Sequence, residues 1–363
     1  MMENSLSTEL FENQLSESKI TEHQEKSYLT YREVLAEFSG SVEEDPEASE
    51  YPDYYGGSYM NENGYLVIQI TEPLSECGEI IQEIAKQEHI LFESVKTSYK
   101  ELLQTMDELN AYFLDDERED KDNVIAFGID EKYNEVFVEL EKCHFDSIQQ
   151  FKNNICNLDY LSFKEGIRLK IEATTRAGLE IQRPAGISSI AYRAIRNNDQ
   201  GIIISGHAAL GHLGSEMRVE NTNTGIITVR QVSGSVDAAF ALRGNVNVQQ
   251  AIGNTNLTHE PALRGFPPNG FPVSQFGRST QLTHGTIQSL NVTVNVFGLD
   301  GRTVTFTNFV RANYHSQGGD SGGPIFERNG TGNRRFIIGV HVASNGHFCR
   351  AINVANALGV RIF

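Results

Sequence analysis

The sequence predicts an all-β domain over residues 181–363, preceded by a smaller α+β domain. Three observations lead to this prediction. The charge of the chain changes abruptly near Glu180. After that point, short β-branched runs alternate with Gly and Asn turns, which is typical of a barrel or sandwich. Before it, hairpin and helix patterns are mixed. A chain of 363 residues is long enough for two or three domains, each with its own core.

The two halves of the chain differ in charge. Residues 1–180 contain 40 acidic and 15 basic residues, a net charge of −25. Residues 181–363 contain 8 acidic residues and 15 basic ones, all of them Arg, a net charge of +7. Opposite charges favour association of the halves, so we expect the N-terminal region to be an intramolecular partner. The second half has no Lys/Arg clusters interleaved with aromatic residues, and no nucleic-acid partner is expected.

The cysteines and the N-terminus exclude other classes. The four cysteines show no C-x-x-C spacing, so neither a metal nor another cofactor is expected; they are Cys77, Cys143, Cys156 and Cys349. Only the last lies in the second half, which precludes a disulfide within that domain. The N-terminus is polar and acidic, with no recognisable signal peptide, and no run of 18 apolar residues predicts a membrane segment.

The first half reads as a leader followed by a small domain. Residues 1–50 are rich in Glu and Ser and predict an acidic flexible leader, mobile or loosely helical. Residues 51–180 predict the α+β domain, in which no catalytic constellation is found. Its expected elements are a hairpin over 59–70 around Asn63-Gly64, a helix from 73 to about 114, a second hairpin over 124–129 and 135–140, a helix over 146–154 and a strand near 167–173.

The residue pattern of the second half predicts β-strands along almost its whole length. Helical periodicity is nearly absent until the segment 351–358. The clearest strand patterns are 202–204, 225–232, 288–297 and 303–310.

One stretch carries specific chemistry: Gly318-Gly319-Asp320-Ser321-Gly322-Gly323-Pro324. Glycines leave backbone N–H groups uncovered, so those of Gly319 and Ser321 can point together at a developing oxyanion. Ser321 Oγ would then be a nucleophile if a base is near. The alternative is an ordinary Gly-rich turn between strands. The stretch resembles the active-serine motif of chymotrypsin-fold serine peptidases, and this resemblance implies two six-stranded β-barrels and a His and an Asp upstream, in that order.

His207 is the best candidate for the base. It follows the apolar run Ile203-Ile204-Ser205-Gly206 and resembles the family's Thr-Ala-Gly-His-Cys segment, with Ala208 in place of Cys. The alternative is a strand-end histidine bound to backbone. His212 competes with it, but no strand directly precedes His212.

Asp237 is the best candidate for the acid that orients His207. It lies in Ser235-Val236-Asp237-Ala238-Ala239, and matches the family's Asp followed by small and apolar residues. A buried carboxylate there would hold the tautomer of the imidazole. Asp300 reads as a hairpin turn. The family uses the residue at Asp320 as a buried ion-pair partner that shapes the oxyanion hole.

The resemblance extends to the bacterial branch that includes alpha-lytic protease and the streptogrisins. Those enzymes carry a long N-terminal pro-region that assists folding and occupies the active site until it is removed. Residues 55–180 resemble it loosely, starting at Tyr55-Gly56-Gly57-Ser58-Tyr59. The family resemblance implies secretion, whereas the lack of a visible signal peptide favours the cytoplasm.

The strand after the serine gives a clue to specificity. His341 resembles the histidine of glutamyl endopeptidases and of picornaviral chymotrypsin-fold proteases, which binds a Glu or Gln side chain in the S1 pocket. The alternative is a strand histidine that faces another partner. The other residues that the resemblance places in substrate binding are His315, Ser316, Val342, Ala343 and Ser344. Many relatives have a Ser bonded to the catalytic Asp where Val342 stands, so we expect Asp237 to be held differently.

Together these residues predict a serine endopeptidase that hydrolyses polypeptides, with a preference for Glu or Gln at P1, made as a zymogen or inhibited by its N-terminal domain. Self-processing is expected near 172–180, where the charge break and acidic P1 candidates coincide. Two alternatives remain: a cytoplasmic protease released by a signal without self-maturation, and an inactive relative that serves as a binding module.

Overall fold

The computed structural model describes residues 3–41, 45–115, 123–167, 169–170, 180–183, 186–209, 213–219, 222–243, 249–262, 265–297 and 303–362. Spatial contacts divide the chain into two compact units. The first contains Met1–Thr105, Glu131–Glu135 and Gly265–Phe271, and the second contains Met106–Asp130, Val136–Arg264 and Pro272–Phe363. The units follow contacts and not chain order, so the domain boundaries at residues 50 and 180 stay predictions.

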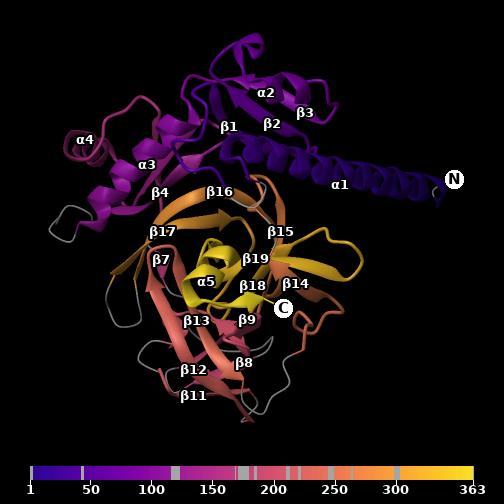
Figure 1. Cartoon of the computed structure of the whole chain (residues 1–363), viewed down its shortest axis with the longest axis vertical. Helices are drawn as coiled ribbons and strands as arrows, with labels where there is room; N and C mark the ends of the chain where they lie inside the picture. The colour runs from indigo at the N-terminus through magenta and orange to yellow at the C-terminus, as the bar shows by residue number, and fades with distance from the viewer. Residues whose placement is uncertain are drawn as a thin grey trace. The chain divides into compact units, whose positions relative to one another are not determined.

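The first unit combines a long helix with a three-stranded sheet (Figure 1). The sheet has the order β1-β2-β3, with β1 antiparallel and β3 parallel to the central strand. The β1–β2 hairpin confirms the expectation for residues 59–70. The elements are α1 (Glu3–Ser39), β1 (Tyr55–Met60), β2 (Leu66–Ile70), η1 (Leu74–Glu76), α2 (Glu79–Ile84) and β3 (Ile90–Ser94).

The leader, expected to be mobile or loosely helical, forms the helix α1, which buries Tyr31, Val34 and Leu35 on one face at helical spacing. One expectation for this unit is wrong. The expected helix from 73 to 114 is interrupted by β3, because Ile90 and its neighbours pair with β2 from Leu66 onward. Backbone pairing with a formed strand outweighed the local helical periodicity of this segment.

The elements that follow confirm the second hairpin and the helix after it. Strands β4 and β5 are hydrogen-bonded neighbours, and β6 lies parallel to β5. The strand expected near 167–173 is the two-residue β7, and β6 lies before it. The bounds are α3 (Tyr99–Leu114), β4 (Val124–Asp130), β5 (Glu135–Leu140), α4 (Phe145–Asn154), β6 (Leu161–Glu165) and β7 (Leu169–Lys170).

The first barrel contains six antiparallel strands in the order β10-β13-β12-β11-β8-β9. Pairing between β10 and β9 closes it, and β21 (Arg361–Ile362) extends the sheet beyond β9. Its strands are β8 (Glu180–Arg183), β9 (Gly186–Arg196), β10 (Asp199–Ile204), β11 (Glu216–Val219), β12 (Thr222–Ser233) and β13 (Val236–Arg243).

The second barrel also contains six antiparallel strands, in the order β15-β18-β19-β20-β17-β16, and β15–β16 pairing closes it. Strand β14 (Thr258–Ala262) is added parallel to β19. Its strands are β15 (Pro272–Gly277), β16 (Gln281–Phe297), β17 (Thr303–Ala312), β18 (Pro324–Glu327), β19 (Arg334–Ala343) and β20 (His347–Arg350), and α5 (Ala351–Leu358) follows them. The two closed barrels confirm the double-barrel fold expected from the serine motif.

Strand β16 connects the second barrel to β4. Its first part pairs with β15 through residue 286, and its last part pairs with β17 on the opposite edge. The edge that β15 leaves is occupied by β4, with Val292 opposite Gly128 and Val294 opposite Ala126. Alternation explains this double use: Val292, Val294 and Val296 enter the core, while the side chains between them are polar.

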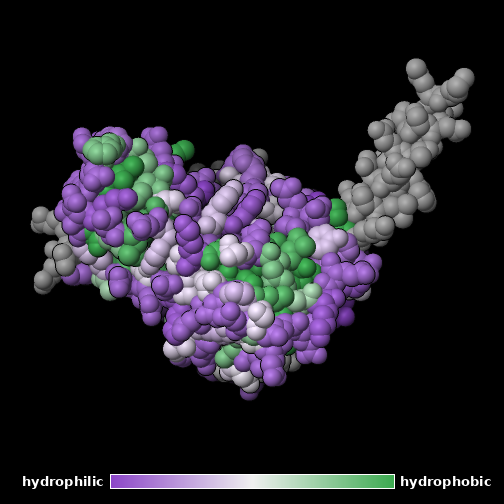
Figure 2. Space-filling view, turned by 90° about the horizontal axis from the view of Figure 1, so that it is seen from above, coloured by the Kyte–Doolittle hydropathy of each residue, from purple (hydrophilic) through white to green (hydrophobic). Residues whose placement is uncertain are grey.

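No helix among the described residues is long and apolar enough to cross a membrane. The face in Figure 2 is largely hydrophilic, with hydrophobic side chains gathered in separate patches.

Candidate active site

His207 lies where β10 ends in a short turn, η2 (His207–Ala209). The preceding Gly206 is required by space, since a Cβ there would lie 2.5 Å from the carbonyl oxygen of Gln231. Arg230 Nε donates to the Gly206 carbonyl at 3.1 Å and fixes the turn from β12. The histidine is therefore held on a rigid support, with its side chain 4% exposed.

Asp237 binds His207 at two points. One carboxylate oxygen, Oδ1, accepts the backbone N–H of His207 at 2.6 Å, and the other, Oδ2, contacts the ring nitrogen Nδ1. Antiparallel pairing of β10 with β13 brings the two segments together. Asp237 is completely buried. A buried carboxylate in this position orients the ring and would stabilise the imidazolium.

Cys349 on β20 contacts the backbone of Asp237. Its Sγ donates to the backbone carbonyl of Asp237 at 3.9 Å. Burial raises the pKa of the Cys349 thiol to about 12, so the group stays a protonated donor. The carboxylate of Asp237 is thus bonded to His207, and its backbone carbonyl is bonded to Cys349 on β20.

Ser321 lies between β17 and β18, and its Oγ donates to the carbonyl of Val342 at 3.1 Å. The loop is joined to β19 by two backbone bonds, Gly322 N–H to His341 at 2.8 Å and His341 N–H to Gly323 at 2.9 Å. Gly322 has a φ of +87°, and a Cβ there would lie 2.4 Å from the Ser189 carbonyl. Only glycine fits this position.

The backbone of the serine loop is fixed by side chains of other segments. Ser279 Oγ donates to the Gly318 carbonyl at 2.5 Å, and Ser189 Oγ donates to the Gly319 carbonyl at 2.8 Å. Gly319 has a φ of +99°. Within the part of the chain that the structure describes, no hydrogen bond uses the Gly319 N–H. This N–H is thus available to an incoming oxygen.

The side chain of Asp320 is bonded to the turn between β15 and β16. Its carboxylate accepts hydrogen bonds from Ser279 N at 2.7 Å, Thr280 N at 3.1 Å, Thr280 Oγ1 at 2.7 Å and Gln317 N at 2.8 Å. It is completely buried. These bonds give Asp320 a role in shaping the loop, and leave Asp237 as the acid beside His207. His212 and Asp300 lie outside the described residues.

The residues expected to bind substrate lie on both sides of this loop. His341 is fully buried, and its Nδ1 is 2.8 Å from the hydroxyl of Tyr314. His315 is exposed and contacts Gln317 at 3.0 Å. Val342 and Ala343 are buried on β19, while Ser316 and Ser344 are half-buried. The structure therefore joins His341 to Tyr314, a partner that the sequence did not suggest.

Sequence reasoning missed four residues at this site: Tyr314, Cys349, Ser189 and Ser279. Each acts through a contact with a residue distant in the chain, such as the 130 positions between Ser189 and Gly319. No local pattern distinguishes them from other buried polar residues. For Tyr314 alone, the closeness to the serine motif was a usable signal.

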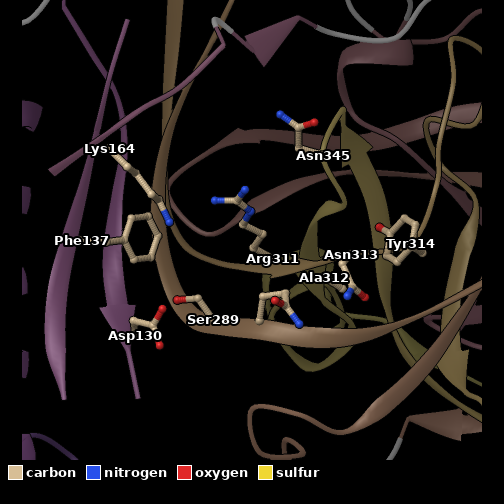
Figure 3. A pocket seen from close by; sticks show the side chains of 10 residues that line it. Asp130, Phe137, Lys164, Ser289, Arg311, Ala312, Asn313, Tyr314 and Asn345 are labelled. Atoms are coloured by element: carbon tan, nitrogen blue, oxygen red, sulfur yellow. The ribbon is translucent and has the colours of Figure 1, made fainter. Parts of the chain in front are cut away.

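A polar pocket of about 320 Å³ lies at the contact between β5, β6 and the second barrel. Figure 3 shows Lys164 and Phe137 on one side, with Arg311 and Tyr314 on the other. Arg311 forms an ion pair with Glu139, which Lys164 also approaches at 3.5 Å. None of His207, Asp237 and Ser321 lines this pocket, so it is separate from the candidate catalytic residues.

Two family models match the N-terminal part of the chain. Residues 14–95 match the family of Pro-like N-terminal domains, and residues 100–166 match that of Pro-like C-terminal domains. A comparison with curated proteins finds no match.

Solved structures cover about half of the chain. A glutamic acid-specific serine protease, described as using a histidine triad in substrate binding, shows 20% identity and a TM-score of 0.42, covering 51% of this chain and 98% of its own. A chymotrypsin from Cellulomonas bogoriensis shows 23% identity and a TM-score of 0.41, and the match covers 52% of this chain and 97% of the chymotrypsin. Protease A from Thermobifida fusca shows 22% identity and 0.40, with the same coverages.

The chain therefore combines two closed six-stranded antiparallel barrels, the double-barrel fold of chymotrypsin-like proteases, with a serine motif between β17 and β18 and Pro-like matches ahead of the barrels. Its N-terminal region is Pro-like over residues 14–95 and 100–166.

Proposed function

We propose that the protein is a serine endopeptidase whose catalytic residues are Ser321, His207 and Asp237. The observation that carries this proposal is the buried carboxylate of Asp237 bound to both the backbone and the ring of His207. The second support is the serine loop, in which two glycines and Ser321 form a turn with an available N–H. No cofactor takes part in the proposed reaction.

In the proposed mechanism, Ser321 Oγ attacks the carbonyl carbon of the scissile peptide while its proton passes to Nε2 of His207. The N–H groups of Gly319 and Ser321 bind the oxyanion of the tetrahedral intermediate. His207 then gives its proton to the leaving amine, and an acyl-enzyme remains. Water attacks this ester with His207 as base, which releases the acid and restores Ser321. Asp237 orients the ring of His207 and stabilises the imidazolium.

We propose that His341 selects Glu or Gln at P1. The Tyr314 hydroxyl lies within hydrogen-bond distance of Nδ1, and donation to that nitrogen places the ring proton on Nε2. A neutral histidine with Nε2–H can donate to a carboxylate or amide oxygen, which an aliphatic pocket cannot do. His315, Ser316 and Ser344 would complete the pocket, and the backbone of 342–344 would pair with an extended substrate.

We propose that the Pro-like region inhibits the protease domain, or assists its folding, until the chain is cut. Pairing of β4 with β16 supports this proposal, because residues of the Pro-like match form part of the same sheet as the second barrel. The expected cleavage segment, 172–180, lies almost entirely outside the described residues.

The decisive test uses purified wild type beside the Ser321→Ala and His207→Ala variants. We expect a fluorophosphonate probe to label wild type only, and wild type alone to be cut after a Glu between 165 and 180. N-terminal sequencing and intact mass locate the cut. Labelling that persists in Ser321→Ala would remove Ser321 as nucleophile. Full-length, unlabelled wild type would support the binding-module alternative, and full-length, labelled wild type would exclude self-maturation.

A further inference from the structure

Two carbonyls of the serine loop, those of Gly318 and Gly319, accept hydrogen bonds from side chains distant in the sequence. Two serines account for this: Ser189 on β9 of the first barrel and Ser279 in the turn between β15 and β16. Neither belongs to the serine motif, and neither has a role in the mechanism above. Both residues are tied to the backbone that would form the oxyanion hole.

Ser279 fixes the peptide that carries the first oxyanion donor. In a planar trans peptide, the C=O and N–H groups point in opposite directions. The Gly318 carbonyl is directed at Ser279 Oγ, so the Gly319 N–H of the same peptide points away from that turn. Glycine on both sides makes this peptide easy to rotate, because no Cβ opposes the change. A rotated peptide would present a carbonyl to the oxyanion and repel it.

Ser189 binds the Gly319–Asp320 peptide and the Ser321–Gly322 peptide, which lie on either side of the Asp320–Ser321 peptide. Its Oγ donates to the Gly319 carbonyl at 2.8 Å and accepts the Arg278 N–H at 3.0 Å. Its own N–H donates to the Ser321 carbonyl at 2.9 Å. The side chain is 1% exposed, so water does not compete for these bonds. Ser189 therefore holds the carbonyls before and after the nucleophile's peptide from a single position.

The second oxyanion donor, the Ser321 N–H, belongs to a peptide that is held by the backbone of the motif itself. The carbonyl of Asp320 accepts the Gly323 N–H at 2.8 Å, which sets the Ser321 N–H on the opposite side of that peptide. This bond is internal to the loop and is formed by the motif itself. Only the Gly318–Gly319 peptide and its successor are bound by side chains outside the motif.

We propose that Ser189 and Ser279 are positioning residues that hold the oxyanion hole in its productive form. This inference rests on the proposed function, since it concerns the same serine loop. The Asp320 carboxylate makes the arrangement reciprocal: it accepts Ser279 N–H and Thr280 N–H and so holds the turn that carries the Ser279 hydroxyl. Loss of the Ser279 hydroxyl lets the peptide before Gly319 rotate. Loss of the Ser189 hydroxyl leaves the peptide after Gly319 held by the bond from Asp320 N–H to the Gln317 carbonyl at 3.1 Å.

The test compares Ser279→Ala, Ser189→Ala and the conservative Ser279→Thr with wild type, all as the active full-chain product. Removal of one oxyanion donor costs about 10²–10³ in kcat, and a donor that is misplaced in most molecules should cost about 10- to 100-fold. We expect this loss in kcat for Ser279→Ala and a smaller one for Ser189→Ala, with KM changed less than about threefold in both. The affinity for a peptide boronic acid, which mimics the tetrahedral oxyanion, should fall by the same factor as kcat/KM. Ser279→Thr keeps the hydroxyl and should restore most of the rate.

Ser274→Ala is the matched control, because Ser274 is also buried in this barrel but contacts His284 at 2.8 Å. Its kinetics should equal those of wild type. Unchanged kcat in both Ala variants would overturn the inference, as would a loss of kcat without a parallel loss of boronic-acid affinity. An equal loss in Ser274→Ala would mean a general packing effect and would also overturn it. A wild type that hydrolyses no peptide would instead overturn the proposed function, and the inference with it.

Discussion

Tyr314 and His341 form the most informative residue pair near the serine loop. Both side chains are buried, and the hydroxyl lies 2.8 Å from Nδ1. If this contact sets the proton on Nε2, Tyr314→Phe should reduce kcat/KM for a Glu substrate about 10-fold relative to a Leu substrate. The aromatic ring remains, so packing against Phe348 is kept. The measurement is the ratio of the two specificity constants in wild type and variant.

Tyr192→Phe is the control for this prediction. Tyr192 is also a buried tyrosine, on β9, and its hydroxyl has no hydrogen-bond partner among the described residues. Its removal should leave the Glu/Leu ratio unchanged. If Tyr314→Phe behaves like Tyr192→Phe, the tautomer argument for P1 selection is wrong.

At the residue scale, sequence reasoning selected only residues that lie within a recognisable motif. Ser321, Gly319, His207 and Asp237 each lie in a short string of small or apolar residues with a recognisable pattern. Tyr314, Ser189 and Ser279 lie in no such string, because their roles depend on which strands the fold brings together. The pair of bonds from Asp237 to His207 likewise depends on β10–β13 pairing, which periodicity does not determine.

At the scale of elements, β16 is the strand on which the second barrel and the Pro-like region meet. The sequence predicted a strand at 288–297 from its β-branched residues, and the structure extends it back to Gln281. Its partner β4 could not be foreseen, since strand patterns give no register across more than 150 residues. The error at β3 has the same origin: a pairing partner outweighed a local helical pattern.

Side chains of β16 should determine how firmly β4 is attached. Ser289 Oγ donates to the Ile129 carbonyl at 2.5 Å, and Asn295 Nδ2 donates to the Val124 carbonyl at 3.1 Å. Each bond should contribute about 1 kcal/mol. In a Ser321→Ala background, replacement of both Ser289 and Asn295 by Ala should lower the unfolding free energy by about 2 kcal/mol. It should also speed hydrogen exchange of the backbone amides at 126–128.

Gln288→Ala serves as the control for the attachment of β4, because its amide bonds to Thr286 on the same strand. It should leave exchange at 126–128 unchanged. Equal exchange in the double variant and in the control would show that backbone pairing alone holds β4.

At the scale of the whole molecule, two buried histidines make the structure sensitive to acid. Burial lowers the pKa of His259 to about 4 and that of His347 to about 4. His347 contacts the Ser344 carbonyl through Nδ1, and Arg311, Glu139 and His341 are the charged or titratable groups around it. His259 Nε2 accepts the backbone N–H of Arg193, and Arg193 and Glu260 are the charged groups near it. Both rings are thus bound as neutral imidazoles.

The sign of the pH dependence follows from these shifts. Below about pH 6.5, the usual pKa of histidine, these two histidines are protonated in the unfolded chain. In the folded chain they become protonated only near pH 4, so the unfolded state binds more protons between these pH values. Stability is therefore complete above pH 6.5 and is lost as the pH falls toward 4, by roughly 3 kcal/mol for each histidine. We expect the urea midpoint of the Ser321→Ala protein to fall across this window. His259→Gln should flatten the dependence by about half, since glutamine does not titrate. A midpoint that stays constant from pH 7 to 4.5, or an equal slope in wild type and variant, would show that these histidines are not held neutral by burial.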